Sequence, residues 1–158
     1  MWDEAELKHL RRCVALAREA LEAGDEPFGS VLVAGDGTVL AEDRNRETSG
    51  GDQTLHPEFA LARWAAANMT REERAAATVY TSGEHCPMCA AAHGWVGLGR
   101  IVYVASSRQL VEWLTALGVP GSPVAAIPAG QVALRVKVEG PVDELTEDIR
   151  ALHVRYRR

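Results

Sequence analysis

Apolar residues recur at helical spacing at both ends of the chain. Near the N-terminus they are Leu7, Leu10, Val14, Ala17 and Leu21, with charged residues between them. Steps of three and four positions predict an amphipathic helix over 3–23, with Asp3 at its N-cap and Glu6 at capping-box spacing. After Pro141 the pattern returns at Val142, Leu145, Ile149 and Leu152. We therefore expect a second amphipathic helix at the C-terminal end.

Short apolar runs, several of them rich in Val, lie between these two helices. Residues 29–34 and 38–42, joined by Gly35-Asp36-Gly37, predict a β-hairpin. The further strands expected are 78–82, 101–105 and 131–138, and the further helices are 57–67, 86–96 and 109–117, with a short helix or turn over 71–77. A hairpin followed by alternating strands and helices predicts an α/β fold, with a mixed five-stranded sheet covered on both faces in three α-β-α layers.

The composition is that of one globular domain, residues 1–158. Hydrophobic residues make up 47% and charged residues 25%, and no apolar run approaches the ~20 residues of a membrane span. The N-terminus is acidic and lacks the pattern of a signal peptide, so we expect a cytoplasmic protein without a membrane partner. The net charge of −5 argues against a nucleic-acid partner, because such binding depends on Lys and Arg.

The candidate chemistry is divided between two short motifs. His56-Pro57-Glu58 contains an imidazole, and Cys86-Pro87-Met88-Cys89 contains two thiols three positions apart. One His and two Cys are ligand types that zinc selects. Three protein ligands would leave a fourth position open, as at a catalytic zinc, and Glu58 is placed to act as an acid and base beside the metal.

Other interpretations of these residues stay open. A structural zinc would need a fourth ligand, for which His85 and His93 are available. A C-x-x-C motif also occurs in redox proteins, and Glu58 alone could be an ordinary first-turn helix charge. Three cysteines do not make a disulfide framework, and Cys13, on the apolar face of the first helix, is expected to be inert core.

The chain resembles the cytidine-deaminase-like superfamily, most closely its guanine deaminase and tRNA adenosine deaminase branch. The matching stretches are 27–33, Asn45, 52–58, 81–89 and Trp95. The resemblance implies a three-layer fold, one zinc per chain bound by His56, Cys86 and Cys89, and hydrolytic deamination of a small amino-substituted heterocycle. It also implies that Glu58 moves the protons, and that the protein is a homodimer.

The resemblance further implies that Phe28, Asn45 and Trp95 contact the substrate base. Three positions depart from the family pattern. His85 replaces a proline and could add a polar contact, Gln109 aligns where guanine deaminases have an acid, and Pro57 lacks the backbone N–H that would face a ring carbonyl. We therefore expect Pro57 and Gln109 to line a site that takes a heterocyclic amine other than guanine, or guanine only poorly.

Two alternative functions remain on the sequence. A tRNA adenosine deaminase would need a basic surface, and Arg150, Arg155, Arg157 and Arg158 do gather near the C-terminus. A zinc-stabilised binding module without catalysis is the second alternative. The presence of Glu58 and an open metal position argues against that module.

Overall fold

The computed structural model describes all 158 residues. The strands are β1 (Gly29–Val33), β2 (Val39–Arg44), β3 (Thr78–Gly83), β4 (Ile101–Ala105) and β5 (Val138–Glu139). The helices are α1 (Glu4–Glu22), α2 (Glu47–Gly50), α3 (Pro57–Asn68), α4 (Arg71–Ala76), α5 (Pro87–Val96), α6 (Ser107–Ala116), α7 (Ala129–Val132) and α8 (Asp143–Tyr156). No helix is both long enough and apolar enough to cross a membrane.

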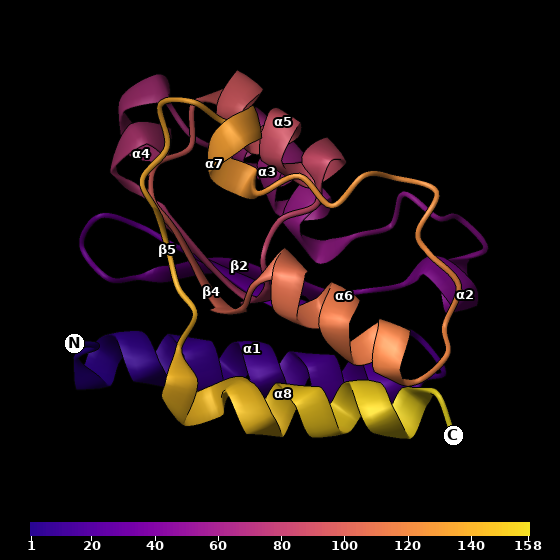
Figure 1. Cartoon of the computed structure of the whole chain (residues 1–158). Helices are drawn as coiled ribbons and strands as arrows, with labels where there is room; N and C mark the ends of the chain where they lie inside the picture. The colour runs from indigo at the N-terminus through magenta and orange to yellow at the C-terminus, as the bar shows by residue number, and fades with distance from the viewer.

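The strands form one mixed five-stranded sheet in the order β2-β1-β3-β4-β5. Strand β1 is antiparallel to both β2 and β3, whereas β3, β4 and β5 are parallel. Helices α1 and α8 lie side by side on one face, and α3, α4, α5 and α7 lie on the other (Figure 1). The three-layer α-β-α prediction is confirmed.

Each face of the sheet has its own apolar core. The larger core joins α1 and α8 to β1 and β4 through residues such as Leu10, Val31, Val104 and Ile149. The smaller core joins α3 to the opposite face through Leu32, Leu61, Ala65, Val79 and Leu98. Because both faces are covered, β1 is buried along its whole length, and the consecutive apolar residues Val31, Leu32 and Val33 follow from this double burial.

The last strand differs most from the sequence prediction. Residues 131–138 do not form a strand: Ala129–Val132 is a helical turn, and only Val138–Glu139 pairs with β4. Ala129 and Ala133 are buried in this segment while Leu134 is 82% exposed. Packing of α7 against α5 therefore overrides the partial apolar and polar alternation.

Smaller differences concern the other segments. The predicted loop 43–54 contains the end of β2 and the short helix α2, and the C-terminal helix begins at Asp143 rather than at Pro141. The capping box of Asp3 and Glu6 is confirmed, with Glu6 N donating to Asp3 Oδ1 at 2.8 Å. This capping box could be predicted from the sequence because both of its partners lie within one helical turn.

A buried acid fixes α2 to the rest of the fold. The Asp25 carboxylate is fully buried and accepts hydrogen bonds from Ser49 N at 2.8 Å, Ser49 Oγ at 2.7 Å and Arg44 Nη1 at 2.9 Å. Burial by itself would raise the pKa of Asp25, but these hydrogen bonds and the Arg44 charge outweigh it and lower the pKa. Asp25 thus holds α2 beside the end of β2.

We predict that Asp25→Asn lowers the free energy of unfolding by about 3 kcal/mol at neutral pH, because it leaves Arg44 without its buried partner. Urea unfolding followed by circular dichroism measures this, with the exposed Asp148→Asn as the control. The lowered pKa of Asp25 means that its contribution is present above the ordinary carboxyl pKa and is lost as the pH falls through the lower folded-state value. A stability difference that does not shrink on acidification would contradict this account.

Candidate active site

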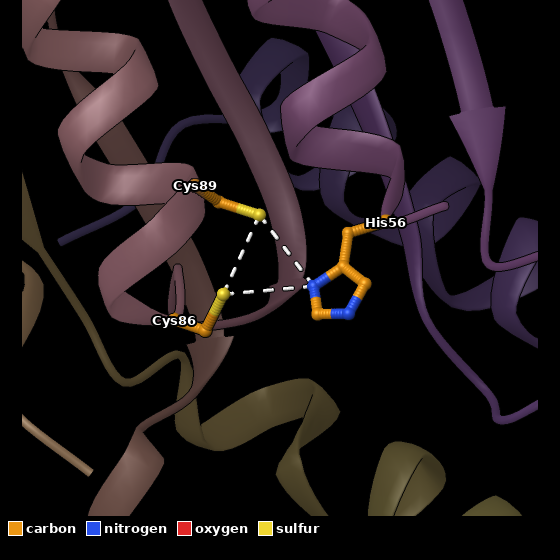
Figure 2. Close-up of side chains that lie close together, drawn as sticks. All are labelled: His56, Cys86 and Cys89. Atoms are coloured by element: carbon orange, nitrogen blue, oxygen red, sulfur yellow. Dashed lines mark hydrogen bonds between the residues drawn. The ribbon is translucent and has the colours of Figure 1, made fainter. Parts of the chain in front are cut away.

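Two helix N-termini converge on the three predicted metal ligands. His56 is the N-cap of α3 and Cys86 is the N-cap of α5, each followed by a proline in the first helical position, and Cys89 lies one turn into α5. The Cys86 Sγ lies 3.5 Å from His56 Nδ1 and 3.5 Å from Cys89 Sγ, and Cys89 Sγ lies 3.6 Å from His56 Nδ1 (Figure 2). The three donor atoms form a nearly equilateral triangle.

This triangle fits a tetrahedral zinc ion. Bonds of about 2.0–2.3 Å give tetrahedral edges of about 3.3–3.8 Å, which match the observed separations. His85 and His93 do not belong to the group of close metal-ligand atoms. The structural-zinc interpretation therefore has no fourth protein ligand from these two histidines, and the three donors suit a zinc with one open position.

The electrostatics of the triangle favour metal binding. Hydrogen bonds from the Cys89 thiol and from His56 lower the pKa of Cys86 to about 4, and the bond to Cys86 raises the pKa of His56 to about 9. The neighbouring Cys86 sulfur and burial raise the pKa of the Cys89 thiol. A metal ion replaces these shared protons, so its binding releases protons and strengthens as the pH rises.

The Glu58 carboxyl group lies on the first turn of α3, two positions after His56. It is 6% exposed, and its Oε1 atom accepts a hydrogen bond from Ser30 Oγ at 3.1 Å. Ser30 Oγ also lies 2.8 Å from Thr81 Oγ1. Burial raises the pKa of Glu58 to about 7, with a further upward contribution from Cys86. A carboxyl group with this pKa can both accept and release a proton near neutral pH.

A cavity of about 210 Å³ opens beside the triangle. Its polar lining includes His56, Glu58, Asn45, Glu47 and Glu84, and its apolar lining comes from Phe28, Pro57, three residues of α6 and the segment 119–126. No Lys or Arg lines it. The shape and lining suit a small planar ring with polar edges.

Comparison with known protein families matches residues 3–105 to the cytidine and deoxycytidylate deaminase zinc-binding region. The match covers more than half of the chain and includes His56, Cys86 and Cys89. The chain belongs to this deaminase family. The zinc prediction agrees with the zinc-binding region that defines the family and with the observed donor group.

Curated relatives within the deaminase family differ in substrate. The chain is 31% identical over 109 residues to a probable cytosine deaminase of Schizosaccharomyces pombe, covering 69% of this chain and 65% of that protein. It is 36% identical over 104 residues to a guanine deaminase of Bacillus subtilis, covering 65% and 66%. A tRNA-specific adenosine deaminase of Agrobacterium fabrum is 39% identical over 93 residues, covering 59% and 60%. The chain thus spans between 60% and 66% of the length of these relatives.

Solved structures of deaminases have the same fold. The guanine deaminase of Bacillus subtilis superimposes with a TM-score of 0.61 at 26% identity, covering 95% of this chain and 93% of that one. A guanine deaminase from Nitrosomonas europaea gives a TM-score of 0.74 at 21% identity, covering 99% and 86%. A tRNA:A34 deaminase gives 0.63 at 25% identity, covering 92% and 99%.

The substrate-contact predictions have different outcomes in the structure. Phe28, Asn45 and Pro57 line the cavity. Trp95 does not: it is 90% exposed near the end of α5 and borders a separate groove with Leu134. Gln109 does not line the cavity either, because its Oε1 accepts a hydrogen bond from Ser106 N at 2.8 Å and closes the capping box of α6. Neither residue reaches this cavity within one chain.

His85 also lies away from the cavity. It is fully buried, with its ring edge-on to His93 at a centroid distance of 5.3 Å. Burial lowers its pKa well below the ordinary value, so the ring is neutral core. The suggestion that His85 adds a polar contact to the substrate is not supported, because the side chain is buried against His93 and does not line the cavity.

Several residues at the site were not expected from the sequence. The apolar residues that follow Ser30 indicated only a strand, so its contact with Glu58 was not predicted. A polar residue in a buried strand is nevertheless an indication of a buried hydrogen-bond partner. Glu84 accepts hydrogen bonds from Ser107 N at 2.9 Å and Ala129 N at 2.8 Å, and so attaches α6 and α7 to the end of β3. Glu47 and segment 119–126 lie in stretches predicted as loops, where no periodicity gives a side-chain direction.

We predict one zinc ion per chain, removed by combining Cys86→Ala with Cys89→Ala, because only His56 would remain of the ligand triangle. Elemental analysis of the purified protein measures the metal. Cys13→Ala is the matched control, since Cys13 is a buried cysteine of the α1 core. Zinc retained in the double variant, or lost in the control, would contradict the assignment of the ligands.

Proposed function

We propose that this deaminase-family protein catalyses the zinc-dependent hydrolytic deamination of a small amino-substituted heterocycle and releases ammonia. The supporting observation is the buried Glu58 carboxyl group, which lines the same cavity as His56 and Cys86. A structural metal site needs no buried acid beside it, whereas hydrolysis needs a group that moves protons. This also argues against a binding module without catalysis.

The proposed chemistry divides between metal and protein. A zinc ion held by His56, Cys86 and Cys89 would lower the pKa of a bound water to about 7 and would supply the nucleophile. Glu58 would take a proton from the attacking water and deliver it to the ring nitrogen beside the reacting carbon. It then moves a second proton to the exocyclic amine. A C–O bond forms, the C–N bond breaks, and ammonia leaves.

The surroundings of Glu58 suit these transfers. Its Oε1 atom contacts the Ser30 hydroxyl, which also contacts Thr81 Oγ1, so the carboxyl group has one anchored oxygen. The apolar walls from Phe28, Pro57 and α6 restrict water around the bound ring, which strengthens the remaining polar contacts. Asn45 is placed to contact a polar edge of the ring.

The cavity favours a free base or nucleoside over a phosphorylated substrate. A phosphate group needs cationic or backbone N–H partners, and the cavity lining contains three Glu side chains without any Lys or Arg. Pro57 at the cavity wall lacks the backbone N–H that a ring carbonyl would require. We accordingly place amino-substituted rings without a ring carbonyl ahead of guanine among the candidate substrates.

A tRNA adenosine deaminase is the alternative function, supported by the similar tRNA-specific enzymes. The C-terminal arginines that suggested it are partly occupied. Arg150 Nη1 pairs with Glu147 at 3.1 Å, and Arg157 Nη2 pairs with Glu26 at 3.4 Å. With a net charge of −5, the protein has little free positive charge for a phosphate backbone.

A homodimer is also proposed. Trp95 and Leu134 are 90% and 82% exposed and border one groove between α5 and the segment after α7. Large apolar side chains gathered in this way are typical of a protein–protein interface, and a second copy of this chain is the proposed partner.

We predict that Glu58→Gln retains zinc and the folded structure but lowers turnover by about 10²–10⁴-fold, because the amide cannot accept the proton. The assay measures ammonia released from a panel of aminopurines, aminopyrimidines, pterins and triazines, with zinc content determined in parallel. Glu112→Gln, an exposed change of the same kind on α6, is the control. Near-normal activity in Glu58→Gln would refute the mechanism.

We also predict no salt-sensitive binding of tRNA at physiological ionic strength, because the acidic surface provides few contacts to phosphate. Fluorescence anisotropy of labelled tRNA at several salt concentrations measures this. Tight binding that weakens steeply with added salt, together with deamination of the bound adenosine, would favour the tRNA enzyme over a small-molecule deaminase.

A further inference from the structure

One acidic side chain in the cavity, that of Glu47, takes no part in the proposed proton transfers. Glu47, the first residue of α2, lines the cavity and its side chain is 20% exposed. Its Oε2 atom lies 3.4 Å from His56 Nε2 and 2.5 Å from Asn45 Nδ2. Figure 2 shows that Nε2 lies on the side of the imidazole turned away from the two sulfurs. Glu47 therefore lies across the ring of His56 from the metal ligand atoms.

Asn45 and Glu47 form one rigid unit. The Asn45 Oδ1 atom accepts a hydrogen bond from Glu47 N at 2.9 Å, while Asn45 Nδ2 donates to Glu47 Oε2. The carbonyl oxygen of the amide is thus occupied, and Asn45 presents itself to a ligand chiefly as an N–H donor. The backbone of α2 is fixed in turn by the bonds from Ser49 to the buried Asp25. The unit keeps its position without a bound substrate.

The other carboxyl groups of the cavity are already engaged. Both oxygens of Glu84 accept backbone hydrogen bonds, from Ser107 N and Ala129 N. Glu58 is bonded to Ser30 and is assigned to proton transfer. Only one oxygen of Glu47 has protein donors nearby, which leaves its Oε1 atom free to accept from a ligand.

We propose that Glu47 determines the specificity of the deamination proposed above, by accepting an N–H from a second amino group or ring N–H on the edge of the heterocycle. A ring that fills the cavity displaces water from this carboxylate. If the ring edge offers no donor there, a charged acceptor is left unpaired, which is costly. A ring carbonyl at the same place would face a negative charge. The favoured substrates are therefore phosphate-free rings that carry on this edge a second amino group, or a ring N–H without a carbonyl group beside it.

Glu47 could act by orienting the His56 ring or by binding the substrate edge, and these two roles predict different effects of its removal. If Glu47 only orients the His56 ring, its removal weakens zinc binding and slows all substrates equally. If it binds the substrate edge, its removal alters the preference between substrates that do or do not offer the N–H. The ratio of two kcat/KM values measured on one protein sample separates these roles, because partial loss of zinc cancels in the ratio.

The experiment compares 2,6-diaminopurine with adenine, which differ by one amino group. Total ammonia release gives kcat/KM for both purines, and titration calorimetry gives both dissociation constants, for the unmodified holoenzyme, Glu47→Gln, Glu47→Ala and the exposed control Glu112→Gln. We expect the unmodified protein and the control to prefer 2,6-diaminopurine by about tenfold to a hundredfold, as for a hydrogen bond to a charged group. The preference should fall severalfold in Glu47→Gln, whose oxygen is uncharged, and vanish in Glu47→Ala.

The outcomes distinguish this inference from the proposed function. A preference unchanged in both Glu47 variants, or absent from the unmodified protein in turnover and binding alike, would overturn the role of Glu47 even if ammonia is released. A binding preference that depends on Glu47 without any ammonia release would support the role of Glu47 and refute the deaminase activity. Equal slowing of both purines with reduced zinc content would show that Glu47 only positions His56, which also overturns the proposal.

Discussion

The site depends on the convergence of two helix N-termini at one end of the sheet. His56 begins α3 and Cys86 begins α5, so both ligands project from helix ends where unpaired backbone N–H groups favour negative charge. The half-buried thiol of Cys86 and the buried thiol of Cys89, beside an imidazole, would be costly as charged groups without a cation. The metal compensates that cost, and the helices in turn are held by the sheet between their packed faces. Glu58 reaches the cavity only because α3 begins at this point.

The polar part of the cavity is supported by a second set of buried contacts. Asp25 bonds to Arg44 and Ser49, and thereby fixes the short helix α2 after β2. Glu84 bonds to the first turns of α6 and α7, which form the outer wall. Each acid satisfies backbone or cationic donors that lie far away in the sequence. Such contacts hold a site on segments that have little regular structure of their own.

The family match and the metal-ligand triangle both indicate a zinc-binding deaminase, but neither determines its substrate. The similar curated proteins include a probable cytosine deaminase, a guanine deaminase and a tRNA-specific adenosine deaminase, so similarity to them does not by itself select a substrate. Substrate selection in such a family depends on the residues that line the cavity. In this chain the cavity is lined by an apolar wall from α6 and 119–126, by Pro57, and by Asn45 and Glu47.

The sequence by itself determined the parts that depend on neighbours along the chain. Periodicity and capping predicted the main helices and four of the strands, and the ligand types and spacing of His56, Cys86 and Cys89 indicated the metal. Tertiary packing decided the rest. Residues 131–138 bury alanines against α5 instead of forming a full strand, Trp95 faces away from the cavity, and Gln109 caps its own helix. Glu47 and Glu84 acquire their roles only when loops distant in sequence meet, and no local pattern encodes which side chains a loop brings together.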